Sequence, residues 1–164
     1  MEVTQERYNY SFNRGRIIED KFSSLMKSRN NKVLKSNTSD DIHKHIDFWV
    51  NNIGIDVKGY RHLDCIWLEL TNVRGNKGWL KGEAEYIVFD VVELNSFCFY
   101  KREDLLNFVL INVKEKTIDK KDFMKFYSRS IWGKKDVLVK CKYKDIKHLE
   151  IQKIEYYCGN GIGQ

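Results

Sequence analysis

Proline is absent from this chain of 164 residues, and no proline-rich linker, internal repeat or low-complexity tract divides it. Without proline, the turns must rest on glycine and asparagine. A chain of 164 residues with 42% hydrophobic content is large enough to bury one apolar core. The sequence therefore predicts a single domain.

Long apolar runs are also lacking. No stretch of eighteen apolar residues exists, and the first residues, MEVTQERYNYSFNRGR, are polar where a secretory signal has an apolar segment. These absences argue against a membrane partner and against export. We expect a soluble protein of the cytoplasm.

Closely spaced cysteine pairs are the third absence. The four cysteines include no C-x-x-C pair, so the spacing of a structural zinc site or a redox motif is missing. We expect buried free thiols at Cys65, Cys98, Cys141 and Cys158. His43 and His45 would share one face of a strand, either as a metal-binding pair or as a solvated or substrate-facing pair.

The charge is unbalanced, with 29 Lys and Arg against 23 Asp and Glu and a net charge of +6. An excess of this sign favours polyanionic partners such as nucleic acid. Lysines gather near the C-terminus, in the segment 134–153. That segment is either a phosphate-facing patch or a solvated surface.

The first regular pattern predicts an amphipathic helix at Arg14–Arg29, with Asn13 as its N-cap. The spacing of i, i+4, i+7 and i+8 defines its apolar stripe, which consists of Ile18, Phe22, Leu25 and Met26. Glu19 lies at the edge of this stripe, so its carboxylate can point along the packed face of the helix.

A β-hairpin follows. Alternating apolar residues predict a strand at Ile42–Val50, and a second, short strand is predicted at Ile55–Lys58. Asn51 and Asn52 between them tolerate the positive φ angles that a two-residue hairpin turn requires.

The remaining patterns complete an α/β (α+β) fold with a central mixed sheet of about five strands, flanked by helices on both faces. Strands are predicted at Cys65–Leu70, Ala84–Val92, Phe97–Tyr100 and Val137–Lys142, and helices from Arg102 and at 122–127. The nearly continuous apolar run of Ala84–Val92 suits a central strand. The segment 146–157 is left unassigned.

The hairpin gathers three charged side chains on one face. With a two-residue loop, Asp47 would sit opposite Asp56, at about 4.5–5.5 Å between Cβ atoms. Two carboxylates so close repel each other unless a cation lies between them or one stays protonated. Lys58 would project from the same face about 7 Å along the strand. Such a face suits Mg²⁺ bound by carboxylates and a substrate phosphate, with Lys58 stabilising developing charge and Glu19 supporting the site.

At these residues the sequence resembles the PD-(D/E)XK nuclease superfamily, through GRIIEDKF, HIDFWV and GIDVKG. The resemblance spans about residues 14–100 in element order. Two departures are Ile46 before the first aspartate, where proline is usual, and Asp56, where glutamate is commoner.

The resemblance implies a restriction-endonuclease-like fold with a catalytic core at about 14–110 and a basic C-terminal part at about 111–164. It also implies Asp47, Asp56 and Glu19 as metal ligands, together with the backbone carbonyl of Val57, and Lys58 as the catalytic lysine. The cofactor would be Mg²⁺, with Mn²⁺ as a substitute, and the partner DNA.

Several further residues have two interpretations each. Glu69 either lies beside the site as a ligand or is an ordinary acid on the outer side of a strand. Side chains able to contact phosphates or stack on a base are Arg74, Lys77, Trp79 and Lys81, followed by Arg129, Lys134 and Lys135. For the first group the alternative is a polar turn with a buried tryptophan. For the second group it is a segment whose aromatic residues pack on the core.

The function predicted from these observations is Mg²⁺-dependent hydrolysis of DNA phosphodiester bonds, in a protein that would suit a phage or a mobile element. Two alternatives stay open: a dimeric nuclease for branched DNA of the Holliday-junction type, and a non-catalytic nucleic-acid-binding module. Clustered carboxylates argue against the last, because they oppose binding to a phosphate backbone.

Overall fold

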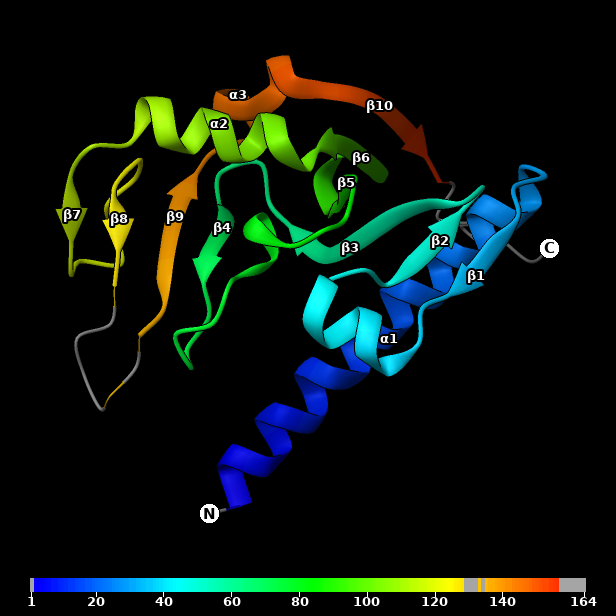
Figure 1. The fold of residues 1–164 in the computed structure, drawn as a ribbon, viewed down its shortest axis with the longest axis horizontal. Coiled ribbons are helices and arrows are strands. Elements are labelled where there is room, and N and C mark those ends of the chain that lie inside the picture. Colours follow the sequence, from blue (N-terminus) through cyan, green and yellow to red (C-terminus); the bar gives the residue numbers. More distant parts are fainter. Residues whose placement is uncertain (1, 129–132, 134, 157–164) are drawn as a thin grey trace, which may run out of the picture.

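The fold has three layers: a long helix, a six-stranded sheet, and a layer that combines a four-stranded sheet with a shorter helix (Figure 1). The structure, a computed structural model, describes residues 2–128, 133 and 135–156, with side chains from residue 13 onward. The mixed α/β single domain predicted from the sequence is confirmed. Its strands form two sheets, however, where one sheet of about five strands was predicted.

The described elements are as follows. The α-helices are α1 (Glu2–Ser28), α2 (Arg102–Asn112) and α3 (Tyr143–Ile146). The six-stranded sheet contains, in spatial order, β1 (Val33–Lys35), β2 (Phe48–Val50), β3 (Ile53–Arg61), β5 (Tyr86–Val91), β6 (Ser96–Lys101) and β10 (Glu150–Glu155). The four-stranded sheet contains β4 (Ile66–Thr71), β9 (Val137–Cys141), β8 (Phe126–Tyr127) and β7 (Lys116–Thr117).

Strand β5 is the centre of the larger sheet. It pairs in parallel with β3 and antiparallel with β6, and the residues from Ile87 to Val91 are buried. This burial on both faces agrees with the nearly continuous apolar run in the sequence. A parallel pair needs a crossover connection. Here that connection contains β4, which leaves the larger sheet and joins the smaller one.

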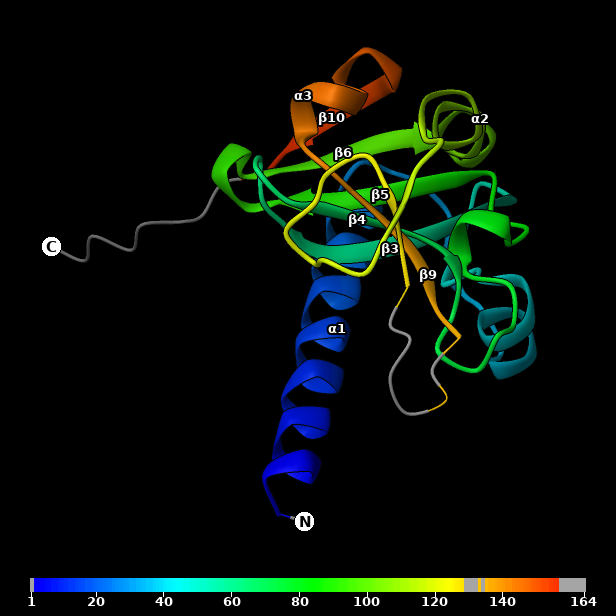
Figure 2. The ribbon, with the colours of Figure 1, turned by 90° about the vertical axis from the view of Figure 1, so that its left-hand side faces the viewer.

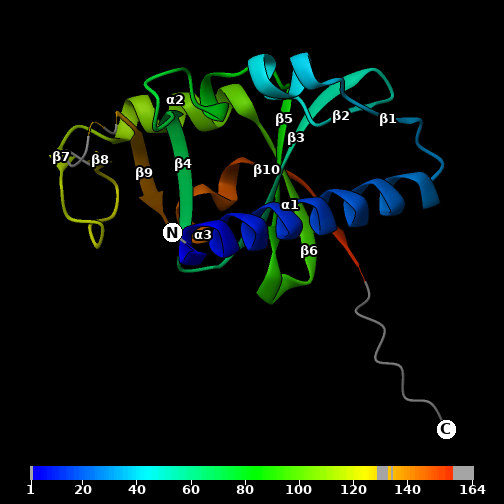
Figure 3. The ribbon, with the colours of Figure 1, turned by 90° about the horizontal axis from the view of Figure 1, so that it is seen from below.

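Helix α1 covers one face of the larger sheet (Figure 3). Its buried stripe includes Ile18, Phe22 and Met26, as predicted, and the Phe22 ring meets that of Phe97 edge-on at 5.3 Å between centroids. On the opposite face, β4 turns Ile66, Leu68 and Leu70 inward toward the apolar side of α2. The two helices therefore enclose two separate apolar clusters with the larger sheet between them.

The start of α1 corrects the predicted N-cap. The helix begins at Glu2, and Asn13 lies in its interior, because residues 2–13 contain neither glycine nor proline to stop it. The first half of α1 consequently extends well beyond the sheets (Figure 2).

The strand predicted at Ile42–Val50 is wrong in its first half, where Asp40–Lys44 form a π-helical turn. The side chain of Asn37 accepts a hydrogen bond from the N–H of Asp40 at 2.8 Å, which favours a helical start over an extended chain. Alternation misled the prediction because Ile42 is 60% exposed while Ile46 is 2% exposed.

The short helix predicted at 122–127 is also wrong. The carboxylate of Asp122 accepts a hydrogen bond from the Thr117 hydroxyl at 2.7 Å, and Asp119 accepts one from the N–H of Lys121. Such local side-chain bonds stabilise turns at the expense of a helix. The chain then enters β8, which pairs with β7 and β9.

No helix in the described part of the chain is long and apolar enough to cross a membrane. Cys65, Cys98 and Cys141 are free thiols; Cys98 and Cys141 are buried, as predicted, whereas Cys65 is only half-buried. Cys158 lies outside the described residues.

Adjacent isoleucines of α1 test the packing of this helix. Ile18 is 3% exposed and Ile17 is 60% exposed. We expect Ile18→Ala to lower the free energy of unfolding by about 2–5 kcal/mol, because it leaves a cavity against β3, and Ile17→Ala to change it by less than about 0.5 kcal/mol. Urea denaturation followed by circular dichroism measures both. Equal effects of the two substitutions would show that α1 is not packed as described.

Candidate active site

The site begins at the β2–β3 hairpin, whose predicted two-residue turn is confirmed. Asn51 and Asn52 have φ angles of 50° and 67°, and Val50 pairs with Ile53. Positive φ at both central positions defines the hairpin turn that matches the twist of the flanking strands. The turn fixes the register, so that Phe48 pairs with Ile55 at the far end of the ladder.

Beyond that pair, β2 ends and Asp47 replaces it beside β3. The backbone N–H of Asp47 donates to the carbonyl of Ile55 at 2.9 Å. Its carboxylate Oδ2 accepts a hydrogen bond from the N–H of Val57 at 2.7 Å. A side chain thus satisfies a backbone group of β3 that lacks a strand partner, and the register of the hairpin brings Asp47 beside Asp56.

Asp56 projects from β3 toward the cluster that packs between the two sheets, and it is fully buried. Neither carboxylate oxygen forms a hydrogen bond of standard geometry with the described residues, although Lys58 Nζ lies 2.7 Å from Oδ1. Buried polar atoms are nearly always hydrogen-bonded. The charge of Lys58 therefore compensates one of two neighbouring buried carboxylates, and a cation bound beside them could compensate the other.

Lys58 lies two residues farther along the same face of β3. Its side chain is 23% exposed, and Nζ lies 5.6 Å from the centroid of the Trp79 ring. The tryptophan and the ion pair with Asp56 restrict the ammonium to the neighbourhood of the acids. The three charged groups of the hairpin are therefore together, as predicted.

The electrostatics of the three groups are coupled. Burial and the neighbouring Asp56 carboxylate raise the pKa of Asp47 to about 7. Burial also raises the pKa of Asp56, an effect that Lys58 opposes. For Lys58 itself, burial alone would lower the pKa, but the two carboxylates outweigh it and the pKa is raised. Two buried acids and one cation leave the cluster one negative charge in excess when all are ionised.

Glu19 of α1 stands at the rim of this cluster. Its carboxylate forms an ion pair with Lys35 of β1. Burial raises the pKa of Glu19, Lys35 lowers it, and the charge of Asp47 adds to the rise. Glu19 therefore interacts with the acid pair electrostatically while its direct contact is with Lys35.

Asp41 belongs to the same charge cluster, and sequence reasoning missed it. Its charge raises the pKa of both Asp56 and Glu19. The signal was obscured because the predicted strand across 42–50 left Asp41 outside the hairpin face, whereas the π-helical turn brings it back toward β3.

The acid pair offers carboxylate oxygens that could bind a divalent cation. In the described part of the chain no group of three or more His, Cys, Asp or Glu side chains can hold a metal ion. Mg²⁺ does not require such a cage, because it is commonly bound by one or two carboxylates with waters and substrate phosphates. Residues of a strand direct their N–H and C=O to the same edge, so the carbonyl of Val57 faces the side where Asp47 lies. Asp47, Asp56 and that carbonyl form a set of hard oxygen donors.

Glu69 lies on β4, half-buried, outside the acid pair, and contributes to the charge around Arg61. The loop that follows β4 approaches the site from the same side. The carbonyl of Lys77 contacts a ring nitrogen of His45 at 3.1 Å. The loop therefore adjoins the turn that positions Asp47.

Arg74, Lys77 and Lys81 are exposed, as phosphate contacts require. The prediction for Trp79 is corrected. Its ring is 6% exposed and meets Phe89 edge-on at 6.0 Å between centroids, so it packs in the core and has no free face for a base. The alternative interpretation of this loop, a polar turn with a buried tryptophan, is therefore correct.

Lys135 is exposed beside the same loop, and its N–H donates to the carbonyl of Val73 at 3.2 Å. Arg129 and Lys134 lie outside the described residues. His43 and His45 do not share a strand face, because the π-helical turn ends at His45 with a φ of 55°. His43 is exposed and His45 is held by the Lys77 carbonyl.

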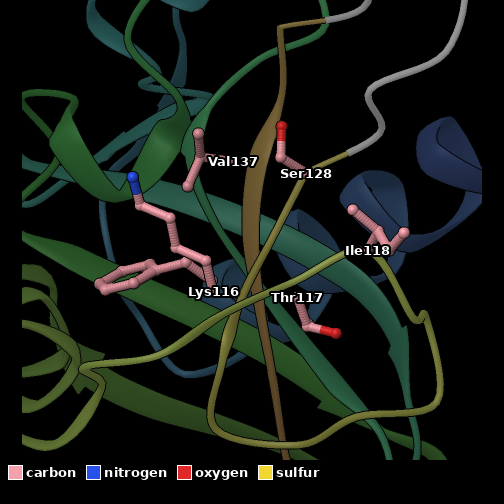
Figure 4. A pocket seen from close by; sticks show the side chains of 6 residues that line it. Lys116, Thr117, Ile118, Ser128 and Val137 are labelled. Atoms are coloured by element: carbon pink, nitrogen blue, oxygen red, sulfur yellow. The ribbon is translucent and has the colours of Figure 1, made fainter.

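A separate hollow lies on the smaller sheet and is lined by Lys116, Thr117, Ile118, Phe126, Ser128 and Val137 (Figure 4). Its described lining has one lysine and no carboxylate. It is therefore distinct from the acidic cluster at β3.

Comparison with known proteins yields no assignment: no family model, no curated protein and no solved structure matches the chain.

The buried acid pair should cost the fold stability when no cation is bound. Asp47→Asn keeps an oxygen that can accept the Val57 N–H and removes one of two neighbouring charges. In EDTA at pH 8 we expect it to raise the free energy of unfolding by about 1 kcal/mol or more. Asp20→Asn, at an exposed position of α1, should change it by less than about 0.5 kcal/mol. A loss of stability in Asp47→Asn, measured by thermal denaturation, would contradict the proposed repulsion.

Proposed function

We propose that the protein is a Mg²⁺-dependent phosphodiesterase that cuts DNA, with its active centre at Asp47, Asp56 and Lys58. The proposal rests on one observation above all: a fully buried aspartate lies next to a second buried carboxylate, and a single lysine is paired with it, beside the stretch of β3 that β2 leaves unpaired. It is supported by the resemblance of the same residues to PD-(D/E)XK nucleases.

Asp47 and Asp56, with the Val57 carbonyl, would hold the metal, and Mn²⁺ should substitute because it prefers the same oxygen donors. When bound, the metal would neutralise charge that develops on the phosphate and lower the pKa of a water molecule. Glu19 would support the site through its charge, since its direct partner is Lys35.

Lys58 would place its ammonium against the phosphate group undergoing attack. A preorganised cation in a partly buried site stabilises negative charge more strongly than one in water. The Asp56 carboxylate and the Trp79 ring hold the ammonium in position, so little rearrangement would be needed on substrate binding. Lys58 would thus stabilise the negative charge that develops on the phosphate during the reaction.

DNA as the substrate is favoured by the net charge of +6 and by the basic loop next to the site. Arg74 and Lys77 are exposed there, with Lys135 alongside. Contacts of this kind bind phosphates without reading sequence. A dimeric nuclease for branched DNA would use the same residues and the same chemistry.

Cleavage assays on linear, circular, single-stranded and four-way-junction DNA test the activity. We expect cleavage with Mg²⁺ or Mn²⁺ and none with EDTA. Asp56→Ala and Lys58→Ala should each lower the rate by about 10²-fold or more, because each removes charge stabilisation in the transition state. Asp20→Asn serves as the control and should cut like the wild type. Cleavage in EDTA, or full activity in both variants, would sink the proposal.

Metal binding has a readout that does not depend on catalysis. A ligand that binds only the folded state raises the melting temperature. We expect Mn²⁺ to raise that of the wild type and of Asp20→Asn, and to leave those of Asp47→Asn and Asp56→Asn almost unchanged. Differential scanning fluorimetry with a Mn²⁺ titration measures this. An equal rise in all four proteins would place the metal elsewhere.

A further inference from the structure

A second polar hollow, of about 260 Å³, lies where α1 passes the end of β3. It is lined by Arg14, Gly15, Ile18, Gly59, Tyr60 and Arg61. Two of these six residues are arginines and none is acidic. The functional site described above uses none of these residues.

The backbone of β3 is shaped around this hollow. Against β5, Lys58 pairs with Phe89 and Arg61 with Val91, so β3 has one residue more than its neighbour over this interval. Tyr60 adopts a φ of 39° at the irregularity. A β-bulge of this kind redirects side chains and is common next to active sites.

Gly59 allows α1 to come close enough to form the other wall. A Cβ at this position would lie 2.1 Å from Cδ1 of Ile18, so only glycine lets the buried isoleucine take its place. The close approach sets Arg14 of α1 above the Tyr60 ring, with Cζ 4.2 Å from the ring centroid. Helix α1 and the end of β3 therefore form the two walls of the hollow, and they contribute Arg14 and Arg61 respectively.

The guanidinium of Arg61 is held by the backbone of β3. Its Nη1 donates to the Gly59 carbonyl at 2.5 Å, while its buried Nε has no hydrogen-bond acceptor among the described residues. Burial lowers the pKa of Arg61, which reflects the cost of holding this cation away from water, and the charge of Asp56 opposes this shift only in part. An anion in the hollow would offset that cost and supply the missing acceptor.

The hollow opens on the α1 face of β3, and Asp56 and Lys58 project from the other face; the two places are connected by the edge of β3 that β2 leaves unpaired. Val57 faces this edge through its bond to Asp47, and the carbonyl of Gly59, two residues farther, is held by Arg61. Lys58 and Arg61 are three residues apart, which corresponds to about 10 Å of extended strand. A polyanionic strand lying along this edge would meet both groups of charges.

We propose that the hollow between Arg14 and Arg61 binds a phosphate group of the DNA strand whose neighbouring phosphodiester bond lies at Asp47, Asp56 and Lys58. Guanidinium groups bind phosphate through paired hydrogen bonds, and the tyrosine ring supports the one from α1. The assignment rests on the proposed nuclease function for the identity of the strand. The phosphate belongs either to the interior of the strand or to its terminus.

DNA binding in EDTA tests the assignment apart from catalysis. The probes are single-stranded and duplex oligonucleotides with a 5′-phosphate, a 3′-phosphate or neither, followed by fluorescence anisotropy at several salt concentrations. Arg14→Gln and Arg61→Gln should each weaken binding roughly tenfold and reduce the slope of log K against log salt concentration by about 0.7–0.9. Arg61→Lys, which loses the paired geometry, should also weaken binding. Inorganic phosphate should compete with DNA for the wild type more strongly than for either Gln variant.

Arg16→Gln is the matched control, because Arg16 is exposed on the same helix and outside the hollow. It should bind nearly as the wild type does. A preference for an oligonucleotide with a terminal phosphate, lost in the Gln variants, identifies a terminal group. Equal affinity for all three ends identifies an internal one. Should Arg61→Gln fail to fold, Arg14→Gln and Arg61→Lys decide the matter.

Two results separate this assignment from the proposed function. If DNA is cut with Mg²⁺ but the arginine variants bind like Arg16→Gln, the phosphate site is overturned and the nuclease stands. If the arginine variants lose affinity but no metal supports cleavage of any DNA, the phosphate site stands and the nuclease fails.

Discussion

The N–H of Val57 faces the edge of β3 at a point where no strand lies beside it, and the Asp47 carboxylate takes the place of the missing strand. This bond decides the character of the whole site. It holds a carboxylate next to Asp56 and keeps the Val57 carbonyl on the same side, while two residues farther along this edge a side chain, that of Arg61, takes the Gly59 carbonyl. A longer β2 would have paired these backbone groups with another backbone and closed the edge.

Burial of the two carboxylates lowers the stability of the fold, and this loss of stability points to a function for the pair. Asp56 is fully buried, and burial raises the pKa of both aspartates, to about 7 for Asp47. Lys58 balances only one of the two charges. Proteins tolerate such local destabilisation where function requires it, while the rest of the fold supplies the stability. Here α1 and the second sheet pack apolar residues on both faces of the six-stranded sheet, and that packing keeps the acids in place.

The sequence predicts the hairpin well because its determinants are local. Asn51 and Asn52 fix the turn, and the turn fixes the register of the hairpin. This register brings Asp47, Asp56 and Lys58 together whatever the rest of the chain packs against the hairpin. The apolar stripe of α1 and the central place of β5 follow from periodicity in the same way. The errors have tertiary causes. Asn37 diverts the chain into a π-helical turn, which hides Asp41 from a strand-based analysis, and the departure of β4 into a second sheet buries Trp79. Arg61 was missed because the bulge at Tyr60 has no signature in a run of alternating residues.

The proposed function depends on a divalent cation that binds between the carboxylates of Asp47 and Asp56. The most direct measurement is the anomalous difference map of a crystal soaked in Mn²⁺ without DNA. The account predicts a peak within coordination distance of oxygens from both aspartates and of the Val57 carbonyl, at about 2.0–2.3 Å. No peak there, with Asp56 still paired only to Lys58 or with manganese bound at another place on the chain, would contradict it.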